Sequence, residues 1–512
     1  MKKIIEIKKD EYWYGGAVND GFRFPLTSDS QYFIDMTYND TYNQLNPLFV
    51  SSKGRYIWLE QAGKVRFDNG KIHIEGEEIE LDEASNTLKE AYLRACHRHF
   101  APTGKEMPLK VFNPQCCSWI ELFYEQNQES LLEYAKGFVK SSEERGIFIV
   151  DEGWQMDYGM WEFDLRKFPE PKKFVDELHE MGFLVMPWIC PYISPDSKAF
   201  RELEGKNLFL CDEKGEPLLV HWWNGYSVQL DFSKKEAREW FNHQLKYLRE
   251  EYGIDGFKMD GGDAVYLPKS CKDGNLHNYY WSKGVDCEIK ELRACYKLAG
   301  EPIIQRLSDK AHRWDVLKIG TGFPPDGCYR YGLSTVLPNM LTAGITGYAY
   351  TCPDMVGGGL WSDFWDKTKL DNELIIRSLQ CSILMPLVQF SLAIWKIEKD
   401  NLKAITEDTL VLRRSFLPYI QELVKQSAKT GEPIVRYMEY EFPGQGLEEA
   451  SEQFMLGDKY LVAPILEKGA TVKKIALPKG VWKDYYTNKK YNGEQEIALP
   501  INLTSLPIFE RL

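Results

Sequence analysis

A short apolar stretch that ends in acidic residues constrains this chain more than any other feature. The segment Tyr252-Gly-Ile-Asp-Gly-Phe-Lys-Met-Asp-Gly-Gly-Asp263 follows a strong helical pattern, is β-capable, and stops in two glycines flanked by Asp260 and Asp263. This pattern is typical of a buried parallel strand that carries a carboxylate to its C-terminal end. Where strands alternate with helices around a barrel, that end holds the catalytic groups, because the loops above it vary without disturbing the core.

Lys258 precedes Asp260 by two residues, so both side chains point to the same face of the predicted strand. A cation on that face favours the ionised form of the acid. Two other interpretations stay open at this point. The two residues can form a structural ion pair at a strand end, or Asp260 and Asp263 can bind a metal ion, with which Lys258 would compete.

Strand and helix patterns alternate from about residue 108 to residue 430. We expect helices over 130–145, 174–181 and 234–251, and strands over 116–123, 146–151, 183–189, 254–259, 302–306, 316–320 and 347–350. Acids and aromatic residues stand at several strand ends, and no glycine-rich phosphate loop follows the first strand. These features predict an α/β fold of the (β/α)8 barrel type and not an open doubly wound sheet.

Short strand patterns flank the predicted barrel on both sides. Residues 1–107 alternate polar and apolar side chains, with Asn69-Gly70 as a hairpin turn, and predict an N-terminal β-sandwich domain. Residues 431–512 predict a small C-terminal β domain, which leaves 108–430 for the barrel. Near the N-terminus, Trp13-Tyr14-Gly15-Gly16 is either a loop that reaches over a pocket of the barrel or a surface turn.

An insertion over residues 194–232 separates the third and fourth predicted strands. It contains His221-Trp-Trp-Asn-Gly-Tyr226, with two adjacent tryptophans. At the catalytic end of a barrel, Trp222 and its neighbour are suited to form a wall for a ring-shaped substrate. The competing interpretation is that they form the core of a small subdomain.

Charge, hydropathy and cysteine content exclude several classes of function. The net charge of −13 and the pI near 5.4 argue against a nucleic-acid or anionic-membrane partner. The N-terminal residues lack the apolar region of a signal peptide, and no run of about 18 apolar residues predicts a membrane span. The 11 cysteines have no regular spacing and fit free thiols in a reducing compartment, so we expect a cytoplasmic protein.

We expect neither a metal nor a cofactor. Cys96-His-Arg-His99 is rich in metal-binding side chains, but no second ligand pair stands at a suitable spacing. The sequence leaves the oligomeric state open, and a homo-oligomer is compatible with it.

Several segments resemble glycoside hydrolase family 31, in the family's order. Gly256-Phe-Lys-Met-Asp-Gly-Gly-Asp263 is similar to the nucleophile strand of the family, and the residues from Gly332 to Tyr348 and from Pro353 to Gly358 are similar to its late barrel segment. The C-terminal markers are Phe416-Leu-Pro-Tyr-Ile420, Gly431-Glu-Pro-Ile-Val-Arg436, Phe454-Met-Leu-Gly457, Leu461-Val-Ala-Pro464 and Leu477-Pro-Lys-Gly-Val-Trp482. The N-terminal part matches more loosely, and its Trp-Tyr-Gly-Gly segment is similar to the branch that contains the myogenesis-regulating glycosidase. On this resemblance we expect no distal C-terminal domain.

The resemblance implies a retaining mechanism, in which one carboxylate attacks the anomeric carbon and a second carboxyl protonates the leaving oxygen and later activates water. Asp260 matches the nucleophile. For the acid/base the resemblance favours Asp326, in Gly322-Phe-Pro-Pro-Asp-Gly-Cys-Tyr329, because it lies just before the late barrel segment, as the family's acid does. Asp315 and Asp309 are the alternatives.

The resemblance also implies which residues bind the sugar. Asp151, at the end of the second strand, would bind distal hydroxyl groups. Arg306 and Asp354 match an arginine that precedes the acid/base and the acid of a late His-Asp pair. The expected substrate-binding set is Asp151, Trp154, Trp188, Trp222, Lys258, Asp263, Arg306 and Asp354.

Two positions depart from the α-glucosidases of the family. Pro353 stands where these usually place a histidine for the 2- and 3-hydroxyl groups, and Gln389 stands where an arginine is usual. Val150-Asp-Glu-Gly-Trp-Gln155 is similar to related α-galactosidase families. The resemblance therefore implies a metal-free, retaining, exo-acting α-glycosidase that acts on an α-glycoside or oligosaccharide.

The implied specificity is that of an α-galactosidase, with α-glucosidase or α-xylosidase activity as the alternative on the same machinery. A catalytically inactive carbohydrate-binding protein is the alternative from another class.

Overall fold

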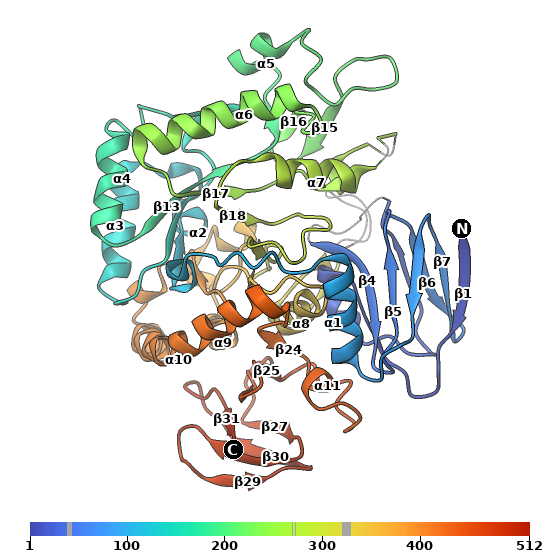
Figure 1. Ribbon diagram of the computed structural model, residues 1–512. Coiled ribbons are helices and arrows are strands. Elements are labelled where there is room, and N and C mark those ends of the chain that lie inside the picture. The colour runs from blue at the N-terminus through green and yellow to red at the C-terminus, as the bar shows by residue number, and fades with distance from the viewer. Residues whose placement is uncertain (38–43, 269, 272, 320–328) are drawn as a thin grey trace.

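The computed structural model describes residues 1–37, 44–268, 270–271, 273–319 and 329–512. Antiparallel N-terminal sheets, a large parallel barrel and a C-terminal β domain follow one another along the chain (Figure 1). In Figure 1 the N-terminal sheets (blue) lie beside the barrel and the C-terminal domain (red) lies below it. This arrangement confirms the predicted fold class.

Eight parallel strands form the barrel, in the order β22-β19-β18-β17-β13-β10-β9-β23. A single parallel bridge between Met355 and Gln389 joins its two edges. The bounds are β9 Gln115–Cys117, β10 Ile147–Val150, β13 Leu184–Ile189, β17 Gly256–Met259, β18 Ile289–Leu292, β19 Ile304–Arg306, β22 Thr351–Cys352 and β23 Gln389–Phe390. Because all eight strands run in the same direction, the residues that follow them converge at one end of the barrel.

Helices surround the barrel (Figure 1). They are α3 Gln128–Val139, α4 Pro171–Glu180, α6 Lys235–Tyr247, α7 Gly274–Gly284, α8 Val336–Ile345, α9 Asn372–Ser382 and α10 Leu402–Thr430. The first three match the predicted helices, although α3 ends at Val139, six residues before the predicted end. Helix α3 begins with a capping box between Asn127 and Ser130, and α4 begins with Pro171, so local sequence fixes both starts.

Several strand predictions are wrong in detail. Only the first residues of 116–123 belong to a strand, because helix α2 (Trp119–Leu122) follows β9 directly. Residues 316–320 do not enter the barrel: β20 (Leu317–Lys318) pairs antiparallel with β21 (Tyr329–Arg330). The predicted strand 347–350 ends just before β22. The prediction also missed β18, which carries Lys290 and Glu291 in place of an apolar run, and the two-residue strand β23.

Two four-stranded sheets form the N-terminal part, in the orders β1-β7-β6-β3 and β2-β4-β5-β8. Their bounds are β1 Lys2–Glu6, β2 Trp13–Ala17, β3 Tyr32–Asp35, β4 Leu45–Ser51, β5 Tyr56–Leu59, β6 Lys64–Asp68, β7 Lys71–Glu75 and β8 Ile79–Asp82, and helix α1 (Leu88–His99) follows. Phe67 of one sheet packs against Phe49 and Trp13 of the other, with ring centroids 5.7 and 6.3 Å apart. The segment Trp13–Gly16 is therefore part of a buried strand, neither a loop over the pocket nor a surface turn.

The N-terminal sheets contact the barrel close to its catalytic end. Gln44 Nε2 donates to the backbone oxygens of Arg293 at 2.8 Å and of Arg306 at 2.9 Å. These two arginines stand at the ends of the neighbouring strands β18 and β19. A side-chain amide from outside the barrel thus helps to fix two strand ends at which the predicted site lies.

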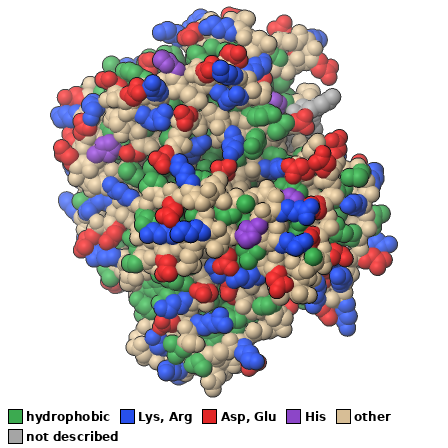
Figure 2. Space-filling model, in the orientation of Figure 1, with side chains coloured by type: hydrophobic (Ala, Val, Ile, Leu, Met, Phe, Trp, Pro, Cys, Tyr) green, Lys and Arg blue, Asp and Glu red, His purple; other side chains and the backbone are tan. Residues whose placement is uncertain are grey.

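The insertion and the C-terminal domain are both built from short strands. In the insertion, β15 (Leu219–Trp222) and β16 (Gly225–Gln229) pair beside β14 (Tyr192–Ile193), and α5 (Lys198–Leu203) precedes them. Figure 1 places α5, β15 and β16 at the top of the molecule. The C-terminal strands are β24 Val435–Arg436, β25 Phe454–Leu456, β26 Tyr460–Val462, β27 Val472–Leu477, β28 Val481–Asp484, β29 Lys490–Asn492, β30 Gln495–Pro500 and β31 Ile508–Arg511; helix α11 (Met438–Glu441) lies between β24 and β25. Figure 2 shows acidic and basic side chains interspersed over the face drawn.

Candidate active site

Asp260 follows β17 directly, and hydrogen bonds hold both of its carboxylate oxygens. Oδ2 accepts from Trp188 Nε1 at 3.0 Å, and Oδ1 accepts from Arg293 Nε at 2.6 Å and from the backbone N–H of Gly261 at 3.0 Å. The residue is buried, with an exposed fraction of 7%. The end of a strand and donors from the two adjacent strand ends therefore fix one carboxylate in a single orientation.

The charge of Asp260 is also fixed. Burial raises the pKa of this carboxyl, but the positive charges of Arg293, Lys258 and Arg306 outweigh burial and hold its pKa below the ordinary value. Asp260 is therefore ionised throughout the neutral range, as a nucleophile must be.

The two glycines that follow Asp260 let the chain turn away from the strand. Gly261 and Gly262 have φ angles of 68° and 75°, in the left-handed region that favours glycine. A Cβ on Gly261 would lie 2.7 Å from the ring of Tyr192. The Tyr192 hydroxyl accepts a hydrogen bond from the Gly262 N–H at 2.9 Å, so the turn also has a fixed partner.

Lys258 pairs with Asp151, which follows β10. The distance from Lys258 Nζ to Asp151 Oδ2 is 2.5 Å, and Cys117 Sγ donates to the same oxygen at 2.9 Å. Burial lowers the pKa of Lys258, but the Asp151 charge outweighs burial and raises it above the ordinary value. Strands β9, β10 and β17 thus bring a thiol, a buried carboxylate and an ammonium together beside Asp260.

Asp263 does not line the cavity described below. Its Oδ2 accepts from an Nη of Arg293 at 2.9 Å, while Arg293 Nε binds Asp260. Burial raises the pKa of Asp263 to about 6 despite the opposing charge of Arg293. Asp263 is therefore linked to Asp260 through Arg293, whose guanidinium bridges the two acids.

A cavity of about 450 Å³ opens over these residues. Aromatic and charged side chains from the strand ends and their loops form its walls, as in typical small-molecule sites. The lining residues are Trp119, Tyr124, Asp151, Glu152, Trp188, Trp223, Asn224, Lys258, Asp260, Tyr266, Arg293, Arg306, Ser308, Asp309, Ile319, Tyr329, Arg330, Tyr331, Leu360, Trp361 and Ser362.

Of the tryptophans predicted to bind substrate, Trp188 lines this cavity, whereas Trp154 and Trp222 lie behind its wall. Trp154 is fully buried and donates from Nε1 to the Trp188 backbone oxygen at 2.8 Å. Trp222 is stacked on Trp188, with centroids 6.5 Å apart and planes at 12°. The adjacent Trp223 lines the cavity instead, so the double tryptophan serves both as a subdomain core and as a wall.

Arg306 and Asp354 form an ion pair at the far side of the cavity. Arg306 Nη1 lies 2.9 Å from Asp354 Oδ1 and 2.6 Å from Asp309 Oδ1. Asp354 is buried and accepts from the Lys310 N–H at 2.7 Å, and it does not line the cavity. Arg306 and Asp309 do line it. Asp354 therefore contacts Arg306 and does not reach the cavity in which a substrate would bind.

Asp326 lies outside the described residues. The described residues on either side of that gap, Ile319 and Tyr329, both line the cavity. Asp309 also lines it, and its Oδ1 forms an ion pair with Arg306. The side chain of Asp315 is 74% exposed, and its bond to Arg313 lowers its pKa, so Asp315 is a poor proton donor.

Glu152 is a cavity residue that sequence reasoning did not predict. Its carboxylate accepts from Tyr158 Oη, Asn224 Nδ2 and, at 3.3 Å, Trp223 Nε1. Burial raises the pKa of Glu152 to about 8, even though these hydrogen bonds oppose the shift. Its position next to Asp151 at a strand end was the available signal, because adjacent residues after a strand reach the same end of the barrel.

The two positions that depart from the α-glucosidase pattern do not line the cavity. Gln389 is fully buried, and its Nε2 donates to Gln115 Oε1 at 3.1 Å and Glu291 Oε2 at 3.0 Å. Glu291 in turn lies 3.4 Å from Arg306 Nε. Gln389 thus belongs to a polar network inside the barrel, beneath the cavity floor.

Among the described residues, no three His, Cys, Asp or Glu side chains are grouped so that they could hold a metal ion. None of the helices in the same part of the chain has both the length and the apolar character needed to span a bilayer.

Comparison with known proteins adds the family. The model of the TIM-barrel domain of glycosyl hydrolases family 31 matches residues 105–307, and the model of the family's C-terminal domain matches residues 431–512. The mouse myogenesis-regulating glycosidase is 30% identical over 75% of this chain and 53% of its own length. Alpha-glucosidase 2 of Bacillus thermoamyloliquefaciens is 25% identical over 75% of this chain and 50% of its own length, so the chain spans about half the length of these curated relatives.

Solved structures share the fold. A family 31 dextranase from Flavobacterium johnsoniae, solved with glucose, has a TM-score of 0.81 and 21% identity, and the match covers 100% of this chain and 66% of the dextranase. A family 31 α-xylosidase from a soil metagenome, solved with xylose, has a TM-score of 0.78 and 22% identity over 100% of this chain and 79% of the xylosidase.

Proposed function

This chain belongs to glycoside hydrolase family 31, and on that premise we propose that it is a retaining, exo-acting α-glycosidase that prefers α-galactosides. The proposed reaction is hydrolysis of an α-glycosidic bond through a covalent glycosyl ester on Asp260. One observation carries the proposal. Asp260 is a buried, ionised carboxylate that Trp188 and Arg293 hold in one orientation on the wall of a cavity.

The first step needs a carboxylate that is charged before substrate arrives. Attack by Asp260 on the anomeric carbon forms the ester while the leaving oxygen takes a proton, and the charges around Asp260 keep it ready for this step. The second step needs a carboxyl about 5 to 5.5 Å away that donates that proton and then removes one from water. We assign this role to Asp326, whose neighbours on both sides of the undescribed segment line the cavity.

Two adjacent acids support sugar binding beside the nucleophile. Asp151 is paired with the Lys258 ammonium, whereas Glu152 is held by the uncharged donors of Tyr158, Trp223 and Asn224. An ionised carboxylate accepts hydrogen bonds from hydroxyl groups, and a protonated carboxyl also donates one. Asp151 and Glu152 together can therefore accept hydrogen bonds from, and donate one to, neighbouring hydroxyl groups of the bound sugar.

The proposed preference for galactose rests on one polar side chain that is missing and one that is added. Galactose and glucose differ only in the direction of one hydroxyl group, so discrimination requires polar groups that leave a partner unpaired for the wrong sugar. Pro353, which does not itself line the cavity, offers no side-chain donor where the family's α-glucosidases place a histidine, and Glu152 adds a carboxyl to the cavity wall. Relatives named as α-glucosidase and α-xylosidase make these activities the second candidates.

A panel of nitrophenyl α-glycosides tests the proposal. We expect the α-galactoside to exceed the α-glucoside and the α-xyloside by at least about tenfold in kcat/KM, which corresponds to about 1.4 kcal/mol of differential transition-state binding. Equal or reversed preference would overturn the galactose assignment and leave the α-glycosidase assignment intact. If the protein hydrolyses no member of the panel and no α-linked disaccharide, both the α-glycosidase assignment and the galactose assignment are overturned.

A further inference from the structure

Two exposed tryptophans stand at the mouth of the cavity on one short 3-10 helix, Trp361–Phe364, and the residue after it. The described part of the chain contains all 15 tryptophans. Trp361 is 39% exposed and Trp365 is 69% exposed, while the others are buried or partly buried. A large aromatic side chain left in water is unfavourable, so two neighbours of this kind indicate a binding surface.

The backbone that carries these tryptophans is held in place. Phe364, between them in sequence, is fully buried and packs against the ring of His312 with centroids 5.3 Å apart. Asp363 Oδ2 accepts from the His312 N–H at 2.9 Å. The exposure of Trp361 and Trp365 is therefore a property of an anchored segment.

The exposed surface is continuous with the catalytic cavity. Trp361 lines the cavity together with Leu360 and Ser362. The ring of Trp365 packs against that of Trp361, with centroids 4.8 Å apart and planes at 63°, and so extends the aromatic wall outward. When the sugar to be released lies at Asp260, the leaving group of the substrate must extend out through the cavity mouth. The wall formed by Trp361 and Trp365 is one side of that mouth.

We propose that Trp361 and Trp365, the tryptophan ridge, bind the sugar ring of the leaving group, so that the natural substrate is an oligosaccharide. The inference rests on the proposed function and deepens it. A pyranose ring presents a face of C–H groups, which packs on an aromatic ring while its hydroxyl groups stay in water. The tryptophan ridge offers two aromatic rings for this contact, those of Trp361 and Trp365, set at an angle to each other beside the cavity.

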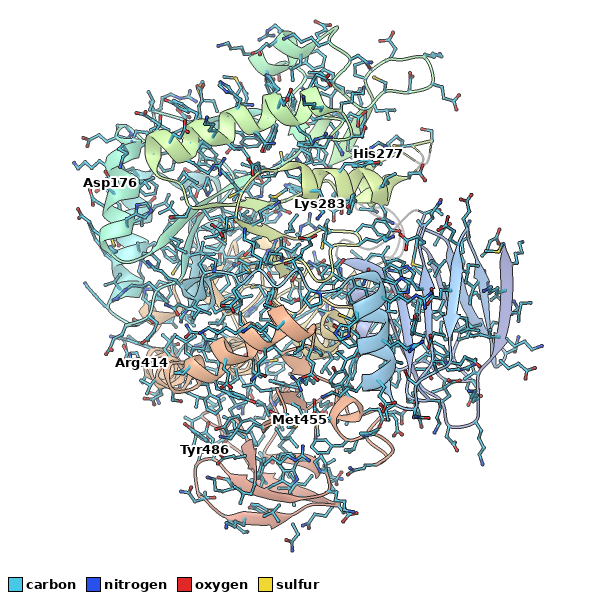
Figure 3. All side chains as sticks on the ribbon, in the orientation of Figure 1. Asp176, His277, Lys283, Arg414, Met455 and Tyr486 are labelled. Atoms are coloured by element: carbon cyan, nitrogen blue, oxygen red, sulfur yellow. The ribbon has the colours of Figure 1, made fainter. Side chains whose placement is uncertain are left out.

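Kinetics with two leaving groups test the ridge. A glycosyl fluoride has no ring beyond the scissile bond, whereas an α-linked disaccharide has one. Trp365→Ala should lower kcat/KM for the disaccharide at least about fivefold and leave that for the glycosyl fluoride unchanged, and Trp365→Phe should retain most of the disaccharide activity. The matched control is Tyr486→Ala, which removes a 55% exposed aromatic ring in the C-terminal domain (Figure 3). Equal loss on both substrates, or no loss on either, would overturn the proposal.

A binding measurement makes the test independent of turnover. In the full chain carrying Asp260→Asn, calorimetry with the disaccharide and with its free non-reducing monosaccharide should show that Trp365→Ala weakens only the disaccharide. Unchanged disaccharide affinity would contradict the ridge even if the wild-type enzyme proves inactive on every glycoside. If sedimentation shows that Trp365→Ala instead dissociates an oligomer, the ridge binds a second copy of the chain and the proposal fails.

Discussion

The ammonium of Lys258 lies 2.5 Å from Oδ2 of Asp151, whereas Asp260, two residues further along the chain, takes its cation from Arg293. Each of the two buried carboxylates thus has a charge partner of its own. Asp151 and Asp260, the proposed sugar-binding acid and the proposed nucleophile, therefore do not compete for one cation in the cavity that they share.

The first prediction concerns the Lys258–Asp151 pair. Lys258→Met should leave Asp151 as a buried charge without its cation and destabilise the protein by about 3 to 5 kcal/mol. Thermal or denaturant unfolding measures the loss. The control is Lys283→Met, which removes a half-exposed partner of Glu301 and should cost no more than about 1 kcal/mol. Similar losses for the two variants would contradict the assignment of Lys258 to a buried pair.

Strand β17 shows which part of the candidate site the sequence predicts and which part it does not. An apolar run between a helix and two glycines predicts β17 and its terminal acid from local pattern alone. The partner of that acid is not local: Lys258, at the spacing that favours a shared face, binds Asp151, and Arg293 comes from the next barrel strand. Such pairing depends on strand register, which one sequence does not contain.

The sequence did not predict strand β18, for a related reason. β18 carries Glu291 into the barrel interior, where it pairs with Arg306 and accepts a hydrogen bond from Gln389, so the pattern of this strand lacks the apolar run by which a buried strand is identified. The same limit applies to the tryptophans. Sequence alone could not say that Trp222 packs behind Trp188 while Trp223 faces the cavity, because the hairpin that orients them had first to be placed.

The second prediction concerns Arg293. Arg293→Gln removes the nearest positive charge from Asp260, so the pKa of Asp260 should rise and the acidic limb of the kcat/KM profile should move to higher pH. We expect a loss of about 10² or more in kcat/KM at neutral pH, since the carboxylate also loses a hydrogen bond that orients it. Arg414→Gln, on the surface (Figure 3), should leave the profile unchanged. An unshifted acidic limb in Arg293→Gln would contradict the role given to this guanidinium.

The third prediction concerns Glu152, whose pKa burial raises from an ordinary value of 4.5 to about 8. A raised pKa stabilises the fold at low pH, and this stabilisation is lost as the pH rises through the folded-state value. Between about pH 5 and pH 8, wild type should therefore lose stability relative to Glu152→Gln, by up to about 1.4 kcal/mol per pH unit.

Thermal unfolding of the two proteins at several pH values measures this difference. Glu133→Gln is the control, because this side chain is 78% exposed and its replacement should give a Tm difference from wild type that does not change with pH. A Tm difference between wild type and Glu152→Gln that does not change over this range would show that Glu152 titrates as an ordinary carboxyl.

The fourth prediction tests Asp326 through the leaving group. A general acid matters most for a basic leaving oxygen, because nitrophenolate departs without a proton. Asp326→Ala should lose about 10² to 10⁴ in activity on disaccharides and much less in the first step with activated aryl substrates. Added azide should then accelerate breakdown of the intermediate and give an α-glycosyl azide. Equal losses on both substrate types without an azide response would show that the acid is a residue other than Asp326.

The central claim is that Asp260 attacks the anomeric carbon and forms a glycosyl ester. The most direct measurement is to inactivate wild type with a 5-fluoro-α-galactosyl fluoride, digest the protein and identify the labelled peptide by mass spectrometry. We expect one label, on Asp260, and no labelling of Asp260→Asn, which should also be inactive. A label on Asp151, Glu152 or Asp263 would contradict it.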